Sequence, residues 1–439
     1  MKSAAWMLVA AATALGAPPP GPPSLETVLR TTKAIDNHAH PKKYVPEGGT
    51  PDDEFDALPC DTLEQAPGPM RTRLDNPEWV GVWHALYGYG FHDMTPEHVK
   101  EMVALKERAM REHAEGYPAW MLDQMGIETM FANRVAMGAG LAPPRFRWVP
   151  FADALMLPLN NESAKRLNSD FDWFYSHEEK LLKSYLTQAH LHAPPAALGE
   201  YLKQVVTPTL ERQKREGAVA LKFEAAYLRP LNFGRVSEAE AERIYARYIR
   251  GGEAPEREYR ALQDFLFHAI AQEAGRLGLA VHFHTGPGCG DYFVERGANP
   301  SLLEGVFNDP SLRKTNFVIV HGGWGTYPKQ VAALLQKPNV YADFSFAVQA
   351  LYPAALAGML REWLELYPEK VLFGTDASPG PPQMSWEEGG WIAAGSARKA
   401  LEIALDGMIR DGEISPERAN EIAVMVLRGN AIKLYGLKP

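Results

Sequence analysis

Short apolar runs alternate with long amphipathic stretches along most of this chain. The apolar runs are rich in β-branched residues: KAIDNHAH (33–40), IETMFAN (127–133), FRWVPF (146–151), AVALKF (218–223), LAVHFH (279–284), NFVIVH (316–321), NVYADFS (339–345) and KVLFGTD (370–376). Between them lie stretches with apolar residues at helical spacing, such as 198–217 and 255–278. The runs are typical of buried strands, and the longer stretches are typical of helices that cover a sheet.

Strands that each precede a helix predict a (β/α)8 TIM barrel over residues 25–437. Residues 41–120 are rich in Pro, Gly, Trp and Tyr and show no strand alternation, so we interpret them as a helical and looped insertion on the active-site face. A doubly wound open sheet is the alternative fold. It requires a glycine-rich phosphate turn after an early strand, whereas HTGPGCG (284–290) follows the fifth run.

The N-terminus has the pattern of a secretory signal peptide over residues 1–17, with one lysine, an apolar stretch and small residues, followed by a Pro-rich linker at 18–24. We therefore expect an exported protein, periplasmic or secreted, without a membrane anchor. The net charge of −9 and the absence of a Lys/Arg run argue against nucleic acid and anionic membranes as partners. A small-molecule substrate is expected, and a homo-oligomer is compatible with the sequence.

The chain has two cysteines, Cys60 and Cys289. Two cysteines are too few for a disulfide framework. In an oxidising compartment they can pair with each other, but two buried free thiols fit the sequence equally well.

Polar residues stand at the ends of the predicted strands, where a barrel builds its active site. They are His38, His40, Lys222, His284, His321 and Asp376. Taken singly, a histidine at a strand end is more often a hydrogen-bonded polar residue, and Asp376 can cap a turn. Together they predict a metal site, because imidazole and carboxylate groups from several strands meet at one mouth.

The chain resembles the amidohydrolase superfamily in LKFEAAYLRPL (221–231), FHTGPG (283–288), the HGGWGTYPKQ run from 321, VLFGTDASP (371–379) and GNAIKLYGL near the C-terminus. It is most similar to the amidohydrolase-related domains that are fused to glutamine-synthetase-like domains. The resemblance implies that His38, His40 and Asp376 hold one divalent ion, expected to be zinc, and that His284 and His321 hold a second. Lys222, carboxylated by carbon dioxide, would bridge them.

The resemblance further implies a metal-dependent hydrolase that cleaves an amide or ester bond with a metal-activated hydroxide. Asp376 and His321 are the predicted catalytic residues, with Asp376 as the proton acceptor. Tyr227 and Arg229 are candidates for binding a substrate carboxylate, although the family has Tyr followed at once by Arg, whereas here Leu228 intervenes. His282 competes with His284 for the metal; we favour His284, which is nearer the strand end, and place His282 one layer deeper.

Two other functions remain open. A decarboxylase would use a single metal held by His38, His40, His284 and Asp376, with His321 as the proton donor. A bridging carbamate on Lys222 is expected only with two metals, so a metal count separates these enzymes. A binding or scaffold protein that has lost catalysis is the third hypothesis, and the complete set of predicted ligands argues against it.

Overall fold

The computed structural model describes residues 23–60 and 68–438, and the predicted signal peptide lies outside that range. All of the predicted apolar runs contain strands. Their bounds are β1 (Ala34–Ala39), β2 (Ile127–Asn133), β3 (Phe146–Val149), β4 (Ala220–Phe223), β5 (Ala280–His284), β6 (Phe317–Val320), β7 (Val340–Asp343) and β8 (Val371–Leu372). Neighbouring strands pair in parallel, in the order β1-β2-β3 and β4-β5-β6-β7-β8.

Backbone hydrogen bonds join these two sets of strands into a closed ring. Between β3 and β4, Lys222 N–H donates to Pro150 O at 2.8 Å. Between β8 and β1, Asn37 N–H donates to Phe373 O at 2.9 Å, and Asp376 N–H donates to His38 O at 2.8 Å. The predicted (β/α)8 barrel is therefore confirmed, and the alternative of an open sheet is wrong.

Apolar side chains fill the lower part of the barrel. Ile35, Phe131 and Val318 belong to one buried cluster that continues to Ala431 on α17 (Asn430–Tyr435). The polar residues predicted from the sequence stand away from this cluster, at the C-terminal ends of the strands.

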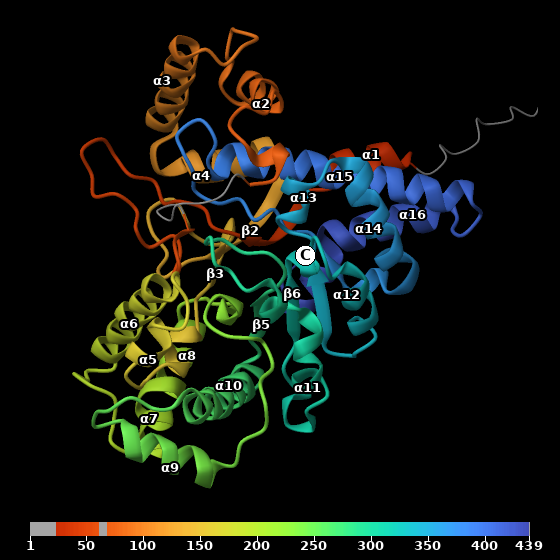
Figure 1. The fold of residues 1–439 in the computed structure, drawn as a ribbon. Helices are drawn as coiled ribbons and strands as arrows, with labels where there is room; N and C mark the ends of the chain where they lie inside the picture. Colours follow the sequence, from red (N-terminus) through yellow and green to blue (C-terminus); the bar gives the residue numbers. More distant parts are fainter. Residues whose placement is uncertain (1–22, 61–67, 439) are drawn as a thin grey trace, which may run out of the picture.

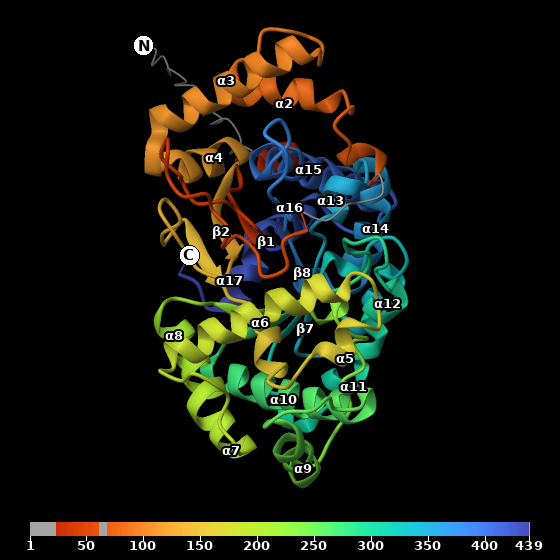
Figure 2. The same cartoon turned by 60° about the vertical axis from the view of Figure 1, so that its left-hand side comes forward.

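Helices surround the ring, as Figure 2 shows for α6, α10, α14 and α15. The α-helices other than α17 have the following bounds: α1 (Leu25–Thr31), α2 (Glu78–Tyr87), α3 (Pro96–His113), α4 (Tyr117–Met125), α5 (Glu162–Lys165), α6 (Phe171–Gln188), α7 (Leu198–Tyr201), α8 (Thr207–Arg215), α9 (Glu238–Tyr248), α10 (Glu256–Leu277), α11 (Glu304–Phe307), α12 (Pro328–Leu334), α13 (Ala347–Ala350), α14 (Pro353–Leu366), α15 (Trp386–Arg410) and α16 (Pro416–Val424). Ser24 caps α1 by accepting a hydrogen bond from Thr27 N.

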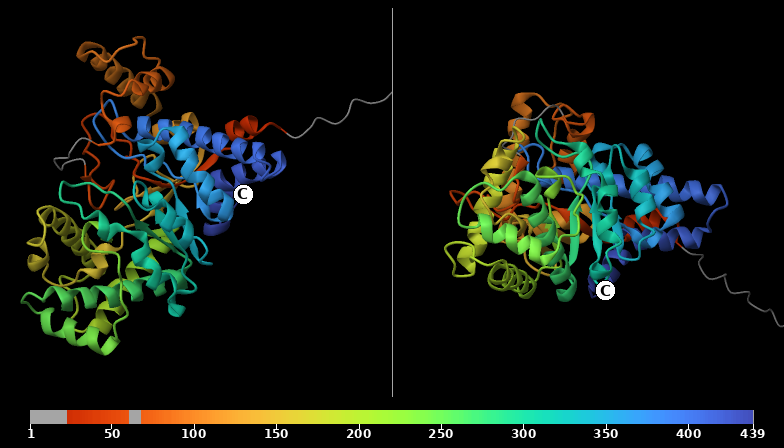
Figure 3. Two further views of the ribbon diagram at one scale, coloured as in Figure 1. Left: turned by 45° about the vertical axis from the view of Figure 1, so that its right-hand side comes forward. Right: turned by 60° about the horizontal axis from the view of Figure 1, so that its bottom comes forward.

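The stretch predicted as an insertion contains α2 and α3, which stand at one end of the molecule (Figures 1 and 3). They pack on each other, and α2 also packs on α15. None of the helices in the described part of the chain is both long and apolar enough to cross a bilayer.

Candidate metal centre and active site

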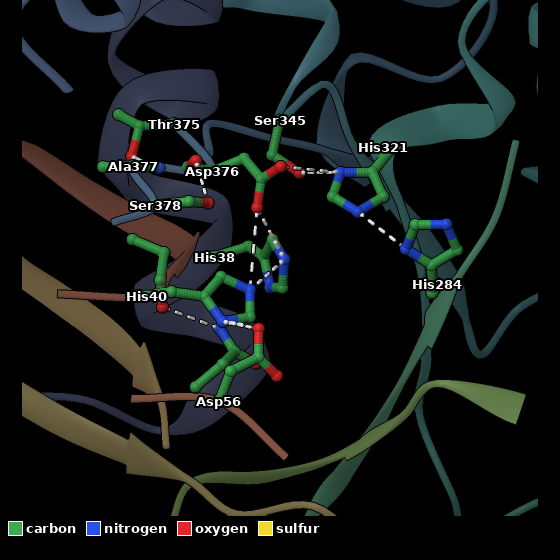
Figure 4. Close-up of polar contacts among 12 residues, drawn as sticks. His38, His40, Asp56, His284, His321, Ser345, Thr375, Asp376, Ala377 and Ser378 are labelled. Carbon is green, nitrogen blue, oxygen red and sulfur yellow. Dashed lines mark hydrogen bonds and ion pairs between the residues drawn. The ribbon is translucent and has the colours of Figure 1, made fainter. Parts of the chain in front are cut away.

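The polar residues predicted at the strand ends come together in the structure, as Figure 4 shows for the four histidines and Asp376. His38 and His40 lie on and just after β1, and His284 ends β5. His321 directly follows β6, and Asp376 follows β8. All four imidazoles are buried, which is unusual for polar side chains unless they have partners.

Three of these residues form a compact set of potential ligand atoms. His38 Nε2 lies 3.1 Å from Asp376 Oδ1 and 3.4 Å from His40 Nε2. His40 Nε2 lies 3.7 Å from the same carboxylate oxygen. One ligand atom from each residue lies within 4.8 Å of the other two. Two imidazoles and a carboxylate at this spacing are a donor set that fits a divalent cation.

A second set is formed by His284 and His321. His284 Nδ1 lies 3.2 Å from His321 Nε2, and Asp376 Oδ2 lies 3.9 Å from His321 Nδ1. Asp376 thus stands between both sets. The two facing nitrogens of His284 and His321 fit a cation between them if both carry lone pairs.

The surroundings of His321 favour the tautomer that has its proton on Nδ1 and its lone pair on Nε2. The Ser345 hydroxyl donates to Asp343 Oδ1 at 2.5 Å, so Ser345 Oγ is left to accept from His321 Nδ1, 2.9 Å away. With its proton on Nδ1, His321 presents an unprotonated Nε2 to His284.

Burial favours the neutral form of three of these imidazoles, those of His38, His284 and His321. Burial lowers the pKa of His38 and of His284 well below the ordinary value, and the nearby charge of Lys222 lowers both further. The pKa of His321 is also lowered, by burial first and then by His284 and Lys222. Neutral imidazoles have the lone pair that metal binding requires.

The pKa of Asp376 lies closer to neutral pH than that of an ordinary aspartate. Burial raises the pKa of Asp376 to about 6, although the charges of His40 and Lys222 act in the opposite direction. A carboxylate with this pKa can take up a proton and return it, as a general base and acid must.

Lys222 points into the centre rather than toward solvent. Its side chain is 1% exposed, and Nζ lies 3.3 Å from His38 Nε2 and 3.9 Å from Glu224 Oε1. The prediction that Lys222 lies with His38 and Asp376 is therefore consistent with the structure.

His321 and Asp376 share an unusual backbone conformation. Their φ angles are 65° and 57°, in the left-handed region that non-glycine residues rarely adopt. Asp376 is held there by the hydrogen bond to His38 O and by Gln349 Nε2, which donates to Asp376 O at 2.8 Å. Strained residues of this kind concentrate at functional sites.

Gly322, next to His321, has a φ of +55°, and a Cβ added there would lie 2.1 Å from Trp363 Cη2 and 2.9 Å from Asp343 O. Trp363 cannot move freely, because it is fully buried and its Nε1–H donates to Pro328 O. We expect Gly322→Ala to lower the free energy of unfolding by about 3 kcal/mol, from overpacking of roughly 1–3 kcal/mol and left-handed strain of roughly 1–2 kcal/mol.

Denaturant unfolding measures this loss. Gly358→Ala is the matched control, because Gly358 lies inside α14 with nothing within 4 Å of an added Cβ. There alanine should stabilise the helix by about 1 kcal/mol. Equal unfolding midpoints for Gly322→Ala and the unsubstituted protein would contradict the steric argument.

A cavity of about 800 Å³ opens over the centre. His40, Lys222, His284, His321 and Asp376 lie at its base, and its walls include Phe55, Trp79, Tyr227, Trp324 and Phe346. This volume and the aromatic walls suit a small molecule with an apolar part.

The two predicted substrate-binding residues differ in position. Tyr227 lines the cavity, and its hydroxyl lies 3.5 Å from His284 Nδ1. Arg229 is not among the described residues that line this cavity; its guanidinium donates to Asp264 Oδ1 at 2.6 Å and to Gln263 Oε1 at 3.1 Å. The charge of Arg229 is thus already paired beside α10, away from this cavity, so the structure offers no support for its predicted contact with substrate.

His282 lies one layer below His284, as predicted. Its Nε2 is 2.8 Å from the Tyr435 hydroxyl, which belongs to α17 at the base of the barrel. His282 thus faces the packed base, which agrees with choosing His284 for the centre.

Several residues of the site were not predicted from the sequence. Asp343 and Ser345 close the seventh run, and polar residues at that strand end were a usable signal. Asp56 has no such signal, because it comes from the long segment after β1 and lies 3.1 Å from His40 Nδ1.

Buried carboxyl groups beside Lys222 were also missed. Glu224 N–H donates to Asp153 Oδ2 at 2.7 Å, and burial raises the pKa of Asp153 to about 7. Burial also raises the pKa of Glu224 and of Glu178 well above the ordinary value. The charge of Lys222 acts in the opposite direction on the pKa of Asp153 and of Glu224.

Comparisons with known proteins agree with this geometry. Residues 218–437 match the protein family described as amidohydrolase. Protein fluG of Emericella nidulans is 25% identical over 231 residues, which are 50% of this chain and 26% of fluG. The chain thus spans about a quarter of the length of that relative.

Solved structures share the fold over nearly the whole chain. A protein of Lactobacillus casei described as a candidate metal-dependent hydrolase has a TM-score of 0.58 at 17% identity, covering 95% of this chain and 98% of that one. The glucuronate isomerase of Caulobacter crescentus has a TM-score of 0.56 at 12% identity, covering 94% of each chain. The uronate isomerase of Thermotoga maritima has a TM-score of 0.54 at 13% identity, covering 94% of this chain and 96% of that one. At these identities the likeness concerns the fold and not the reaction.

Proposed function

The chain belongs to the amidohydrolase family, and on that premise we propose that it is a metal-dependent hydrolase that cleaves an amide or ester bond of a small molecule. The observation that carries the proposal is the convergence of six polar residues, of which all but His38 line one cavity; they are His38, His40, Lys222, His284, His321 and Asp376. The family as a whole generally binds divalent metal ions.

The residues fit two ions. His38, His40 and Asp376 would hold one, because their ligand atoms already converge. His284 and His321 would hold the other through the nitrogens that face each other. We propose zinc, which imidazole and carboxylate ligands suit. When bound, the ions supply the positive charge that acidifies water and polarises a carbonyl oxygen.

Lys222 is proposed to act as a carbamate. An ammonium group has no lone pair for a metal, whereas the neutral Nζ would add to carbon dioxide, form an N–C bond and release one proton. The product shares one negative charge between two oxygen atoms, so Lys222 would offer each of two cations an oxygen ligand. Its burial and its position against His38 support this role.

Asp376 is proposed to accept the proton of the attacking water and to pass it to the leaving group. Its carboxylate faces both histidine sets, and its pKa of about 6 suits both directions of transfer. Tyr227, whose hydroxyl lies in the cavity wall beside His284, is placed to donate a hydrogen bond to the substrate.

The position of Lys222 favours this hydrolase over the single-metal decarboxylase, which has no use for a bridging carbamate. The described residues also contain the disulfide Cys60–Cys289. Disulfides persist in oxidising compartments, which supports export as the proposed location.

Metal removal tests the function. We expect about two zinc ions per chain, and hydrolysis of at least one substrate among N-acyl amino acids, dipeptides and lactones. A chelator should abolish that hydrolysis, and added zinc should restore it. Metal content is measured by elemental analysis and hydrolysis by product release; one ion per chain together with release of carbon dioxide from a carboxylic acid would favour the decarboxylase instead.

A further inference from the structure

Asp56 contacts a proposed metal ligand from outside the barrel strands. Its Oδ2 lies 3.1 Å from His40 Nδ1, while His40 Nε2 faces His38 and Asp376 (Figure 4). The two nitrogens of His40 therefore have different surroundings, with a carboxylate on one side and the proposed metal set on the other. The Asp56 side chain is only 14% exposed, so water competes weakly for this contact.

Asp56 lies in a segment that is fastened at both ends, which we call the Asp56 arm (residues 52–60). At its start, the Arg134 guanidinium donates to both oxygens of Asp52 at 2.8 Å, and both side chains are almost fully buried. The backbone N–H of Val135 donates to Glu54 O at 2.9 Å. These contacts tie the start of the arm to the residues that follow β2.

At its other end, the arm is held by the disulfide between Cys60 and Cys289. Cys289 belongs to the loop that begins directly after His284, and both cysteines line the cavity over the centre. The disulfide thus connects the arm beside His40 with the loop that follows a proposed ligand of the second ion.

We infer that Asp56 is a positioning residue for His40 and that the disulfide holds the Asp56 arm against the metal centre. The negative charge of Asp56, 3.1 Å from His40 Nδ1, favours a proton on that nitrogen, which leaves the lone pair on Nε2. A carboxylate behind a metal-binding histidine makes the ring a better ligand, and losing it typically weakens metal binding by about 10–100-fold. The inference rests on the proposed function, since it requires His40 Nε2 to bind the ion.

Zinc affinity of the full-length, metal-free protein tests this inference. Zinc alone is titrated in competition with a coloured chelator, and the thermal midpoint of each metal-free protein is measured in parallel. Asp56→Asn should weaken zinc binding by about 10–100-fold and leave the metal-free midpoint unchanged. The matched control is Asp53→Asn, an exposed residue of the same arm, which should leave both values unchanged.

The double variant Cys60→Ser/Cys289→Ser tests the disulfide separately; serines are used because free thiols would themselves bind zinc. Its zinc affinity should fall between those of the unsubstituted protein and Asp56→Asn. An unchanged zinc affinity in Asp56→Asn overturns the inference and leaves the proposed function standing. A lower zinc affinity that is accompanied by a lower thermal midpoint of the metal-free protein also overturns it, because Asp56 would then be structural. If the unsubstituted protein binds no zinc, the inference and the proposed function fail together.

Discussion

Asp376→Asn is expected to lower kcat/KM by about 10³-fold, within the range of 10²–10⁴ that general acid–base catalysis contributes. Asparagine keeps the size of the side chain and one oxygen that faces His38 and His40. It cannot take up the proton that the proposed mechanism assigns to Asp376. The fall in kcat/KM should therefore be larger than a change in side-chain shape alone would cause. It is measured on the zinc-loaded protein with the best substrate of the screen.

Zinc content and the thermal midpoint of the same variant show whether the loss is chemical. Asp406→Asn, on the exposed side of α15, is the control and should keep full activity. If Asp376→Asn retains more than about a tenth of the activity, the proton acceptor is another group, because a general base contributes at least ~10²-fold.

Lys222→Ala is expected to lower activity by at least about 10²-fold, because a misplaced or missing group at a metal site costs that much or more. Alanine removes the proposed bridge, so the zinc content should fall below two ions per chain. A short carboxylic acid such as acetate or formate fits the space left by the lysine and carries the same pair of oxygens as a carbamate. We therefore expect millimolar acetate or formate to restore part of the activity.

This rescue distinguishes the carbamate from an ordinary lysine. Lys203→Ala, which removes an exposed lysine, is the control. Its activity should equal that of the unsubstituted protein, and added acetate or formate should not change it. Full activity of Lys222→Ala without added acid would argue for a single-metal enzyme. Restoration by methylamine rather than by acetate would show that the amine itself, and not a carbamate, acts at the centre.

The strands of the barrel were predictable because their signal is local. A buried parallel strand is apolar on both faces, so a run such as NFVIVH or AVALKF stands out from the amphipathic helices that flank it. The polar exceptions within those runs were informative for the same reason. Lys222 and His284 interrupt apolar segments, and in the structure both side chains reach the mouth of the barrel.

Most of the candidate site followed from one geometric rule. Parallel strands that close into a barrel bring their C-terminal ends to one mouth, so residues far apart in the chain become neighbours. His38 and Asp376 are separated by most of the sequence, yet their ligand atoms lie 3.1 Å apart. The resemblance to amidohydrolases assigned roles to these residues, and those roles stay predictions; the family match covers residues 218–437.

By itself, then, the sequence determined which residues form the strands and which polar groups stand at their ends, because the apolar pattern of a buried strand can be recognised within a few neighbouring residues. Only the tertiary structure decided what the loops do. It paired Cys60 with Cys289 across 229 positions, brought Asp56 to His40 and turned Arg229 to Asp264. Loop residues carry no periodicity that reports their direction, and their partners are chosen by how the loops pack over the finished barrel.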